Sequence, residues 1–161
     1  MTRHLLIVLG VVVALLACTS IDCPVQNTVR TVYAFRNVEG TADTLKDTMM
    51  VVSARINRTD TTLLKWSTGV MQFSLPIGYA NPEDTLYFVF RNGSFRAIDT
   101  VWIKKENIPH FESVDCSAAF FHELIAVRST HNAIDSIVIK NSSVTYEPDT
   151  EHFHLYLKGH N

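Results

Sequence analysis

The sequence has no large excess of positive or negative charge and contains few glycines, prolines or cysteines. Its 161 residues carry 14 Lys plus Arg against 16 Asp plus Glu, with 6 Gly, 5 Pro and 3 Cys. Nucleic-acid-binding proteins usually show a basic excess, and disordered chains have fewer apolar residues than the 47% found here. We therefore expect one folded domain and no nucleic-acid partner.

The short motifs that accompany common catalytic chemistry are also absent. The sequence has no Gly-x-Ser-x-Gly segment, phosphate-binding loop, dinucleotide-binding glycine pattern, His-Glu-x-x-His pair or Cys-x-x-Cys pair. These absences favour a protein that is not an enzyme and needs no cofactor.

The longest apolar run, residues 5–17, is 13 residues long and follows Arg3. A membrane-spanning helix needs about 20 apolar residues, whereas a short cationic start followed by a shorter apolar run is typical of a secretory signal peptide. The run ends in Leu15-Leu16-Ala17-Cys18, which resembles the bacterial lipobox. We predict that residues 1–17 form a lipoprotein signal peptide and that Cys18 is acylated. The alternative is an ordinary signal peptide that ends near a cysteine.

The two remaining cysteines, Cys23 and Cys116, are predicted to form one disulfide, because an exported protein meets an oxidising compartment. The alternatives are a reduced pair or a metal site, although two thiols without close spacing are a weak metal signal. Residues 18–22 would form a short lipid tether, which at about 3.6 Å per residue keeps the domain, residues 23–161, within about 20 Å of the membrane.

Short segments rich in Val, Ile, Thr and aromatic residues, separated by turns, indicate an all-β protein. We expect an antiparallel β-sandwich, immunoglobulin-like, with a small β-barrel as the alternative. Asn92-Gly93 predicts a two-residue hairpin in which Phe90 faces Phe95, and residues 120–127 also fit a short helix. The expected strands are residues 28–35, 48–56, 61–67, 70–75, 85–91, 95–103, 110–114, 120–127, 134–139, 144–146 and 153–158.

The last of these segments alternates apolar and polar residues, which predicts one face in the core and one in solvent. His152 and His154 fall on the polar face, where a solvated pair is a commoner arrangement than a metal site.

Trp66 and Trp102 are candidates for a sugar-stacking platform, with burial as the alternative.

Seven of the nine Asp residues are followed by Ser or Thr, whereas 27 Ser plus Thr among 161 residues predict about one or two such pairs. Asp followed by Ser or Thr and then an apolar residue or Thr resembles the O-glycosylation motif of exported Bacteroidota proteins. The alternative is structural, because Asp favours turns and Thr favours the start of a strand. The possible acceptors are Thr44, Thr48, Thr61, Thr85, Thr100 and Ser136.

Several of these features together resemble a family of small Bacteroidota envelope lipoproteins of unknown function. They are the lipobox, Cys23-Pro24 with Asn27, Leu75-Pro76, Asp115-Cys116 and the stretch 129–139. The resemblance implies an envelope location and assigns no activity or catalytic residue.

We therefore expect a non-catalytic lipoprotein that is anchored in the outer membrane through its lipid. The surface-export signal of such lipoproteins is a cluster of acids just after the acylated cysteine, whereas Asp22 is the single acid just after Cys18. We therefore expect the protein to face the periplasm. Its domain would be a binding or structural module for a protein or glycan partner. The alternatives are a carbohydrate-binding accessory lipoprotein and, less favoured, a metal-binding protein or an enzyme.

Overall fold

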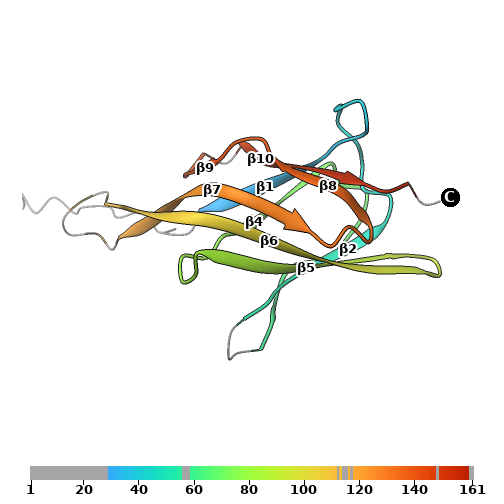
Figure 1. The fold of residues 1–161 in the computed structure, drawn as a ribbon, viewed down its shortest axis with the longest axis horizontal. Helices are drawn as coiled ribbons and strands as arrows, with labels where there is room; N and C mark the ends of the chain where they lie inside the picture. The colour runs from blue at the N-terminus through green and yellow to red at the C-terminus, as the bar shows by residue number, and fades with distance from the viewer. Residues whose placement is uncertain are drawn as a thin grey trace, which may run out of the picture.

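The computed structural model of the protein describes residues 29–55, 59–111, 113, 116, 118–147 and 149–159. These residues form ten strands and no helix, and none of them belongs to an apolar helix of membrane-spanning length. The strands are β1 (Arg30–Phe35), β2 (Thr48–Ser53), β3 (Thr61–Ser67), β4 (Gln72–Pro76), β5 (Glu83–Asn92), β6 (Phe95–His110), β7 (Ala119–Ser129), β8 (Ile134–Ile139), β9 (Ser143–Val144) and β10 (Glu151–Leu157) (Figure 1).

The strands form two sheets, with the orders β4-β1-β10-β8 and β3-β2-β5-β6-β7-β9. The pairing of β1 with β10 is parallel, and the other strand pairs are antiparallel. Side chains from both sheets share one apolar core, so the prediction of an all-β sandwich is confirmed.

An aromatic stack joins the two sheets at the centre of this core. The ring of Tyr33 lies 4.9 Å from that of Phe73 and 4.8 Å from that of Phe153, both stacked on it within the four-stranded sheet. Phe88 of the six-stranded sheet meets Tyr33 edge-on at 6.0 Å. Burial raises the pKa of Tyr33 well above its ordinary value, so this phenol stays neutral.

The long strand β6 differs from the prediction of separate strands at 95–103 and 110–114. It runs unbroken from Phe95 to His110, and β7 pairs with it as far as His110. Pro109 is tolerated because β5 pairs with β6 only as far as Lys104, so no strand requires the missing N–H there. Residues 120–127, for which a helix was the alternative, belong to β7.

The β5–β6 hairpin is shifted by one residue from the predicted turn. Asn92 pairs with Phe95, so Gly93 and Ser94 form the turn, and Phe90 faces Ala97 instead of Phe95. Gly93 has a φ of +54°, and the side-chain amide of Asn92 donates to Asp47 Oδ1 at 2.9 Å. Asn92 is therefore held within the ladder, and glycine adopts the left-handed conformation.

Candidate binding cleft

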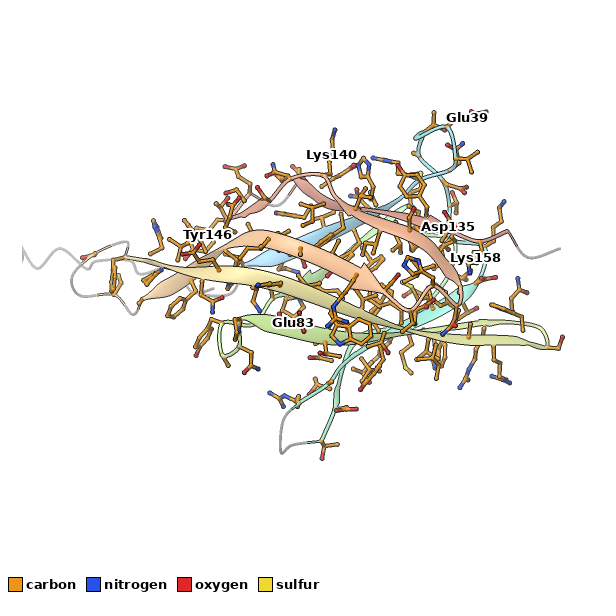
Figure 2. All side chains as sticks on the ribbon, in the orientation of Figure 1. Glu39, Glu83, Asp135, Lys140, Tyr146 and Lys158 are labelled. Carbon is orange, nitrogen blue, oxygen red and sulfur yellow. The ribbon has the colours of Figure 1, made fainter. Side chains whose placement is uncertain are left out.

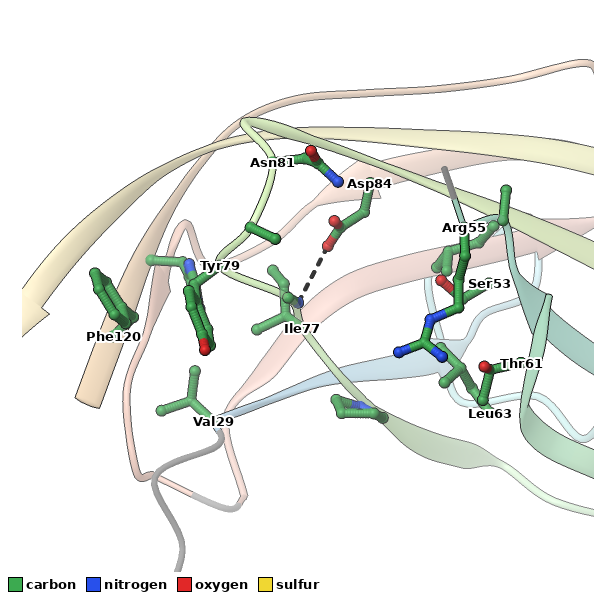
Figure 3. Close-up of a pocket in the computed structure, with 16 residues that line it drawn as sticks. Val29, Ser53, Arg55, Thr61, Leu63, Ile77, Tyr79, Asn81, Asp84 and Phe120 are labelled. Carbon is green, nitrogen blue, oxygen red and sulfur yellow. Dashed lines mark hydrogen bonds between the residues drawn. The ribbon is translucent and has the colours of Figure 1, made fainter. Parts of the chain in front are cut away.

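A cleft of about 780 Å³ opens at one end of the sandwich. Its walls come from three parts of the chain: the β2–β3 connection, the β4–β5 loop and the start of β7. Val29, directly before β1, also lines it. Figure 3 shows apolar, aromatic and polar side chains around the cleft, among them Ser53, Arg55, Leu63, Tyr79, Asp84 and Phe120.

A buried ion pair lies behind this cleft. Lys105 follows Val101 and Ile103 at alternate positions of β6, so the strand directs its side chain into the interior. Its Nζ lies 2.9 Å from Asp84 Oδ1 and donates to the carbonyl of Asn81 at 3.0 Å. The Lys105 side chain is fully buried, whereas that of Asp84 is 20% exposed. The pair satisfies the buried ammonium and leaves the carboxylate within reach of the cleft.

A second polar chain fixes the β4–β5 loop. The amide of Asn107 donates to the carbonyl of Tyr79 at 2.9 Å, and its Oδ1 lies 2.8 Å from Nδ1 of buried His122. Burial, and after it the charge of Lys105, lower the pKa of His122 to about 4. His122 is therefore neutral at neutral pH, and the loop that forms one wall is tied to β6 and β7.

Two stacked aromatic rings, one from the β4–β5 loop and one from the start of β7, line the cleft where these two walls meet. The centroids of Tyr79 and Phe120 are 4.7 Å apart, with 11° between the ring planes. Tyr79 is 63% exposed, and Figure 3 shows its ring on the cleft side of Phe120. The cleft therefore offers a flat aromatic surface on one side and the hydrogen-bonding groups of Asn81, Asp84 and Arg55 around it (Figure 3). Such a surface suits reversible binding of a polar ligand with an apolar face.

The predicted solvated histidine pair is not formed, because the structure buries His152. Its Nδ1 accepts a hydrogen bond from the backbone N–H of Val32 at 3.0 Å, whereas Nε2 of His154 lies 2.9 Å from Glu151 Oε2. The β1–β10 register shifts at this point, which places both His152 and Phe153 in the interior. Among the described residues, no group of three or more His, Cys, Asp or Glu is arranged to hold a metal ion.

Neither tryptophan is buried, since Trp66 is 39% exposed and Trp102 is partly exposed, but the two do not form a bare platform. The guanidinium of Arg91 lies over the ring of Trp66 at 4.1 Å, and that of Arg128 over Trp102 at 3.9 Å. Cation–π stacking therefore occupies one face of each ring. The aromatic pair that lines the cleft is Tyr79 with Phe120, which the sequence did not single out.

The proposed O-glycosylation acceptors are all at least partly exposed: Thr44 and Thr61 are exposed, and Thr48, Thr85, Thr100 and Ser136 are partly exposed. Their preceding Asp residues also have structural contacts, such as those of Asp47, Asp84 and Asp99. Modification of these sites stays a prediction.

The acylation and disulfide predictions fall partly outside the described residues. Cys18 and Cys23 lie outside them, and Cys116 lies within them, between β6 and β7. The acylation of Cys18 and the pairing of Cys23 with Cys116 stay predictions.

The molecule is thus a β-sandwich with a polar and aromatic cleft at one end. Residues 48–157 match the model of a family of unknown function (DUF6452), and the chain belongs to that family. The match covers β2 to β10 and every cleft-lining residue from Ser53 to His122. No curated protein and no solved structure matches the chain.

Proposed function

We propose that this protein is a non-catalytic envelope lipoprotein, anchored through Cys18 in the outer membrane and facing the periplasm, whose sandwich binds a protein or glycan partner in the cleft. The observation that carries the binding role is the cleft itself, which has a volume of about 780 Å³ and is lined by the stacked Tyr79–Phe120 pair, Asp84 and Arg55. The sequence around Leu15-Leu16-Ala17-Cys18 supports the anchor.

The architecture of the cleft favours binding because its carboxylate, Asp84, is held in place before a ligand arrives. Asp84 is fixed by Lys105 at 2.9 Å and by the N–H of Gly78 at 3.3 Å. Fixed groups lower the conformational cost of binding, which is the main advantage of a preformed site. A glycan is the candidate favoured by Tyr79, because a sugar ring stacks on an exposed aromatic face while its hydroxyls bond to Asp84 and Asn81.

Site-specific photocrosslinking in the native host tests the binding role. A benzophenone amino acid is placed at Tyr79 in the full-length protein, and a matched control carries it at Val38, which is fully exposed between β1 and β2 and does not line the cleft. We expect an adduct from position 79 that is absent from position 38. Mass spectrometry of the adduct distinguishes a protein partner from a glycan.

Equal adducts from both positions, or none from position 79, would contradict binding in the cleft. The anchor is tested separately by the intact mass of membrane-extracted protein. We expect a chain that begins at an acylated Cys18, and a mature chain that begins at any other residue would contradict the anchoring.

A further inference from the structure

Exposed apolar side chains gather at the end of the β6–β7 hairpin. Ile108 near the end of β6 is 44% exposed, and Phe111 directly after β6 is 66% exposed. Tyr146, from the β9–β10 connection, is 37% exposed and lies against Phe121, the β7 residue that pairs with Ile108. We call these three residues the hairpin tip. Single exposed apolar residues are common on soluble proteins, whereas several at one extremity indicate a contact surface.

The hairpin tip is backed by packed rings. The rings of His110 and Phe121 stack at 4.2 Å, and Tyr146 meets Phe121 edge-on at 5.0 Å. The strand ladder continues through the pairing of His110 with Ala119. The packed rings at the tip therefore come from β6, from β7 and from the β9–β10 connection.

The two sides of the hairpin carry no charged residue in the described positions nearest to its end. The described residues 107–111 and 118–122 include no Asp, Glu, Lys or Arg. Because these two described stretches offer no cationic side chain that would attract negative headgroups, they suit zwitterionic lipid better than anionic lipid.

The tip lies at the end of the molecule where the described chain begins. Val29 lines the same cleft as Tyr79 and Phe120, and Phe120 pairs with Pro109, which stands between Ile108 and His110 in β6. Figure 2 shows Tyr146 toward one end of the long axis and Glu39 and Lys158 toward the other. Cys18 precedes Val29 by 11 residues, which span at most about 40 Å when extended.

We propose that the hairpin tip rests in the interfacial region of the membrane, so that Ile108, Phe111 and Tyr146 form a second contact with lipid beside the acyl anchor. The inference depends on the anchoring in the proposed function. Aromatic side chains favour the interface because their rings are apolar and their edges are polar. With two points of attachment, the cleft opens close to the lipid surface.

Fluorescence quenching in vesicles tests this orientation. The acylated mature protein carrying Phe111→Trp is reconstituted in phosphatidylcholine vesicles with and without brominated acyl chains. A matched control carries Val38→Trp, and the signal of Trp66 and Trp102 is subtracted with the parent protein. We expect brominated lipid to quench the tryptophan at position 111 at least twofold more than that at position 38. Tyr146→Trp provides a second tip position if the first variant does not fold.

The outcomes separate this inference from the proposed anchor. Protein that floats with the vesicles but shows equal quenching at positions 111 and 38 overturns the tip contact and leaves the anchor intact. Acylated protein that does not float with vesicles overturns both. Quenching at position 111 that requires anionic lipid overturns the assignment to a zwitterionic surface.

Discussion

At the scale of single residues, Asp99 shows how one carboxylate organises a turn. It is fully buried, and its two oxygens accept hydrogen bonds from Thr130 Oγ1 at 2.7 Å and from the backbone N–H groups of Asn132, Ala133 and Ile134 at 2.6 to 2.8 Å. Burial alone would raise the pKa of Asp99, but the bonds from Asn132, Ile134, Thr130 and Ala133 outweigh it and the pKa is lowered. The aspartate thus fixes the connection from β7 to β8.

We predict that Asp99→Asn destabilises the fold. The asparagine side chain has an NH₂ donor in place of one carboxylate oxygen, so this donor would face the N–H donors of the turn and form no hydrogen bond with them. The bonds to the remaining oxygen would also lose the contribution of the charge, and a hydrogen bond to a charged group contributes roughly 1.5–3 kcal/mol. The expected loss in unfolding free energy is about 3 kcal/mol, measured by urea denaturation at pH 7. The control is Asp135→Asn, at an exposed aspartate, with an expected change within about 0.5 kcal/mol. Similar losses in the two variants would contradict the role of Asp99.

His122 makes stability depend on pH. Its folded pKa of about 4 lies below the ordinary value of 6.5. Between these values the unfolded chain binds a proton that the folded protein does not, so stability falls as the pH falls from 6.5 to 4 and this contribution levels off below 4. The resulting loss in unfolding free energy reaches at most about 3 kcal/mol.

We predict that His122→Gln flattens the pH dependence of the melting temperature over that window, because glutamine keeps a polar group beside Asn107 without titrating. Circular dichroism melts at several pH values give the slope, with the exposed His131→Asn as the control. A slope in His122→Gln equal to that of the parent protein would show that another group is responsible. Burial also lowers the pKa of His152, so part of the slope is expected to remain.

At the scale of elements, the β5–β6 turn depends on Gly93. Its φ of +54° is unfavourable for other L residues, and a Cβ added there meets no atom within 4 Å. Gly93→Ala is therefore expected to cost about 1 kcal/mol through backbone strain alone. Gly159→Ala is the control, because that position also has open space but no left-handed φ. Thermal denaturation compares the two, and an equal effect would contradict the strain argument.

The strands were largely predictable because their residues follow the simple rule of apolar and β-branched alternation. The β6 extension was not predictable from alternation, since residues 104–109 include Lys104, Glu106 and Pro109, which ordinarily interrupt a strand. That segment continues as a strand because β7 pairs along it, which is a tertiary effect. The hairpin shift has the same origin, because Asp47 from another strand connection holds Asn92 within the ladder.

At the scale of the whole molecule, the cleft was not predictable because its walls come from segments far apart in the sequence. Ser53, Tyr79 and Phe120 meet only when β2, the β4–β5 loop and β7 are assembled. One local signal was present: Lys105 stands at the next inward position after Val101 and Ile103, and a lysine in an apolar series predicts a buried partner. The partner, Asp84, was recognisable only in the structure.

The predicted disulfide would link the two sheets at the cleft end. Cys116 stands between β6 and β7 of the six-stranded sheet, and Cys23 precedes β1 of the four-stranded sheet by a few residues. A bond between them closes a loop of about 94 residues, for which the chain-entropy model gives a stabilisation of about 4–5 kcal/mol. The bond would also hold the lipid tether beside the hairpin tip.

We predict that Cys23→Ser lowers the melting temperature by roughly 10 °C, since each kcal/mol shifts a domain of this size by about 2–4 °C. Cys116→Ser and the double variant should show the same loss, because removing either partner removes the whole bond and the second substitution adds nothing. Reductant should lower the parent protein to the same temperature and leave the variants unchanged. Additive losses in the double variant, or a Cys23→Ser protein that melts with the parent, would show that the two cysteines act independently and that the acyl chain alone determines the distance between sandwich and membrane.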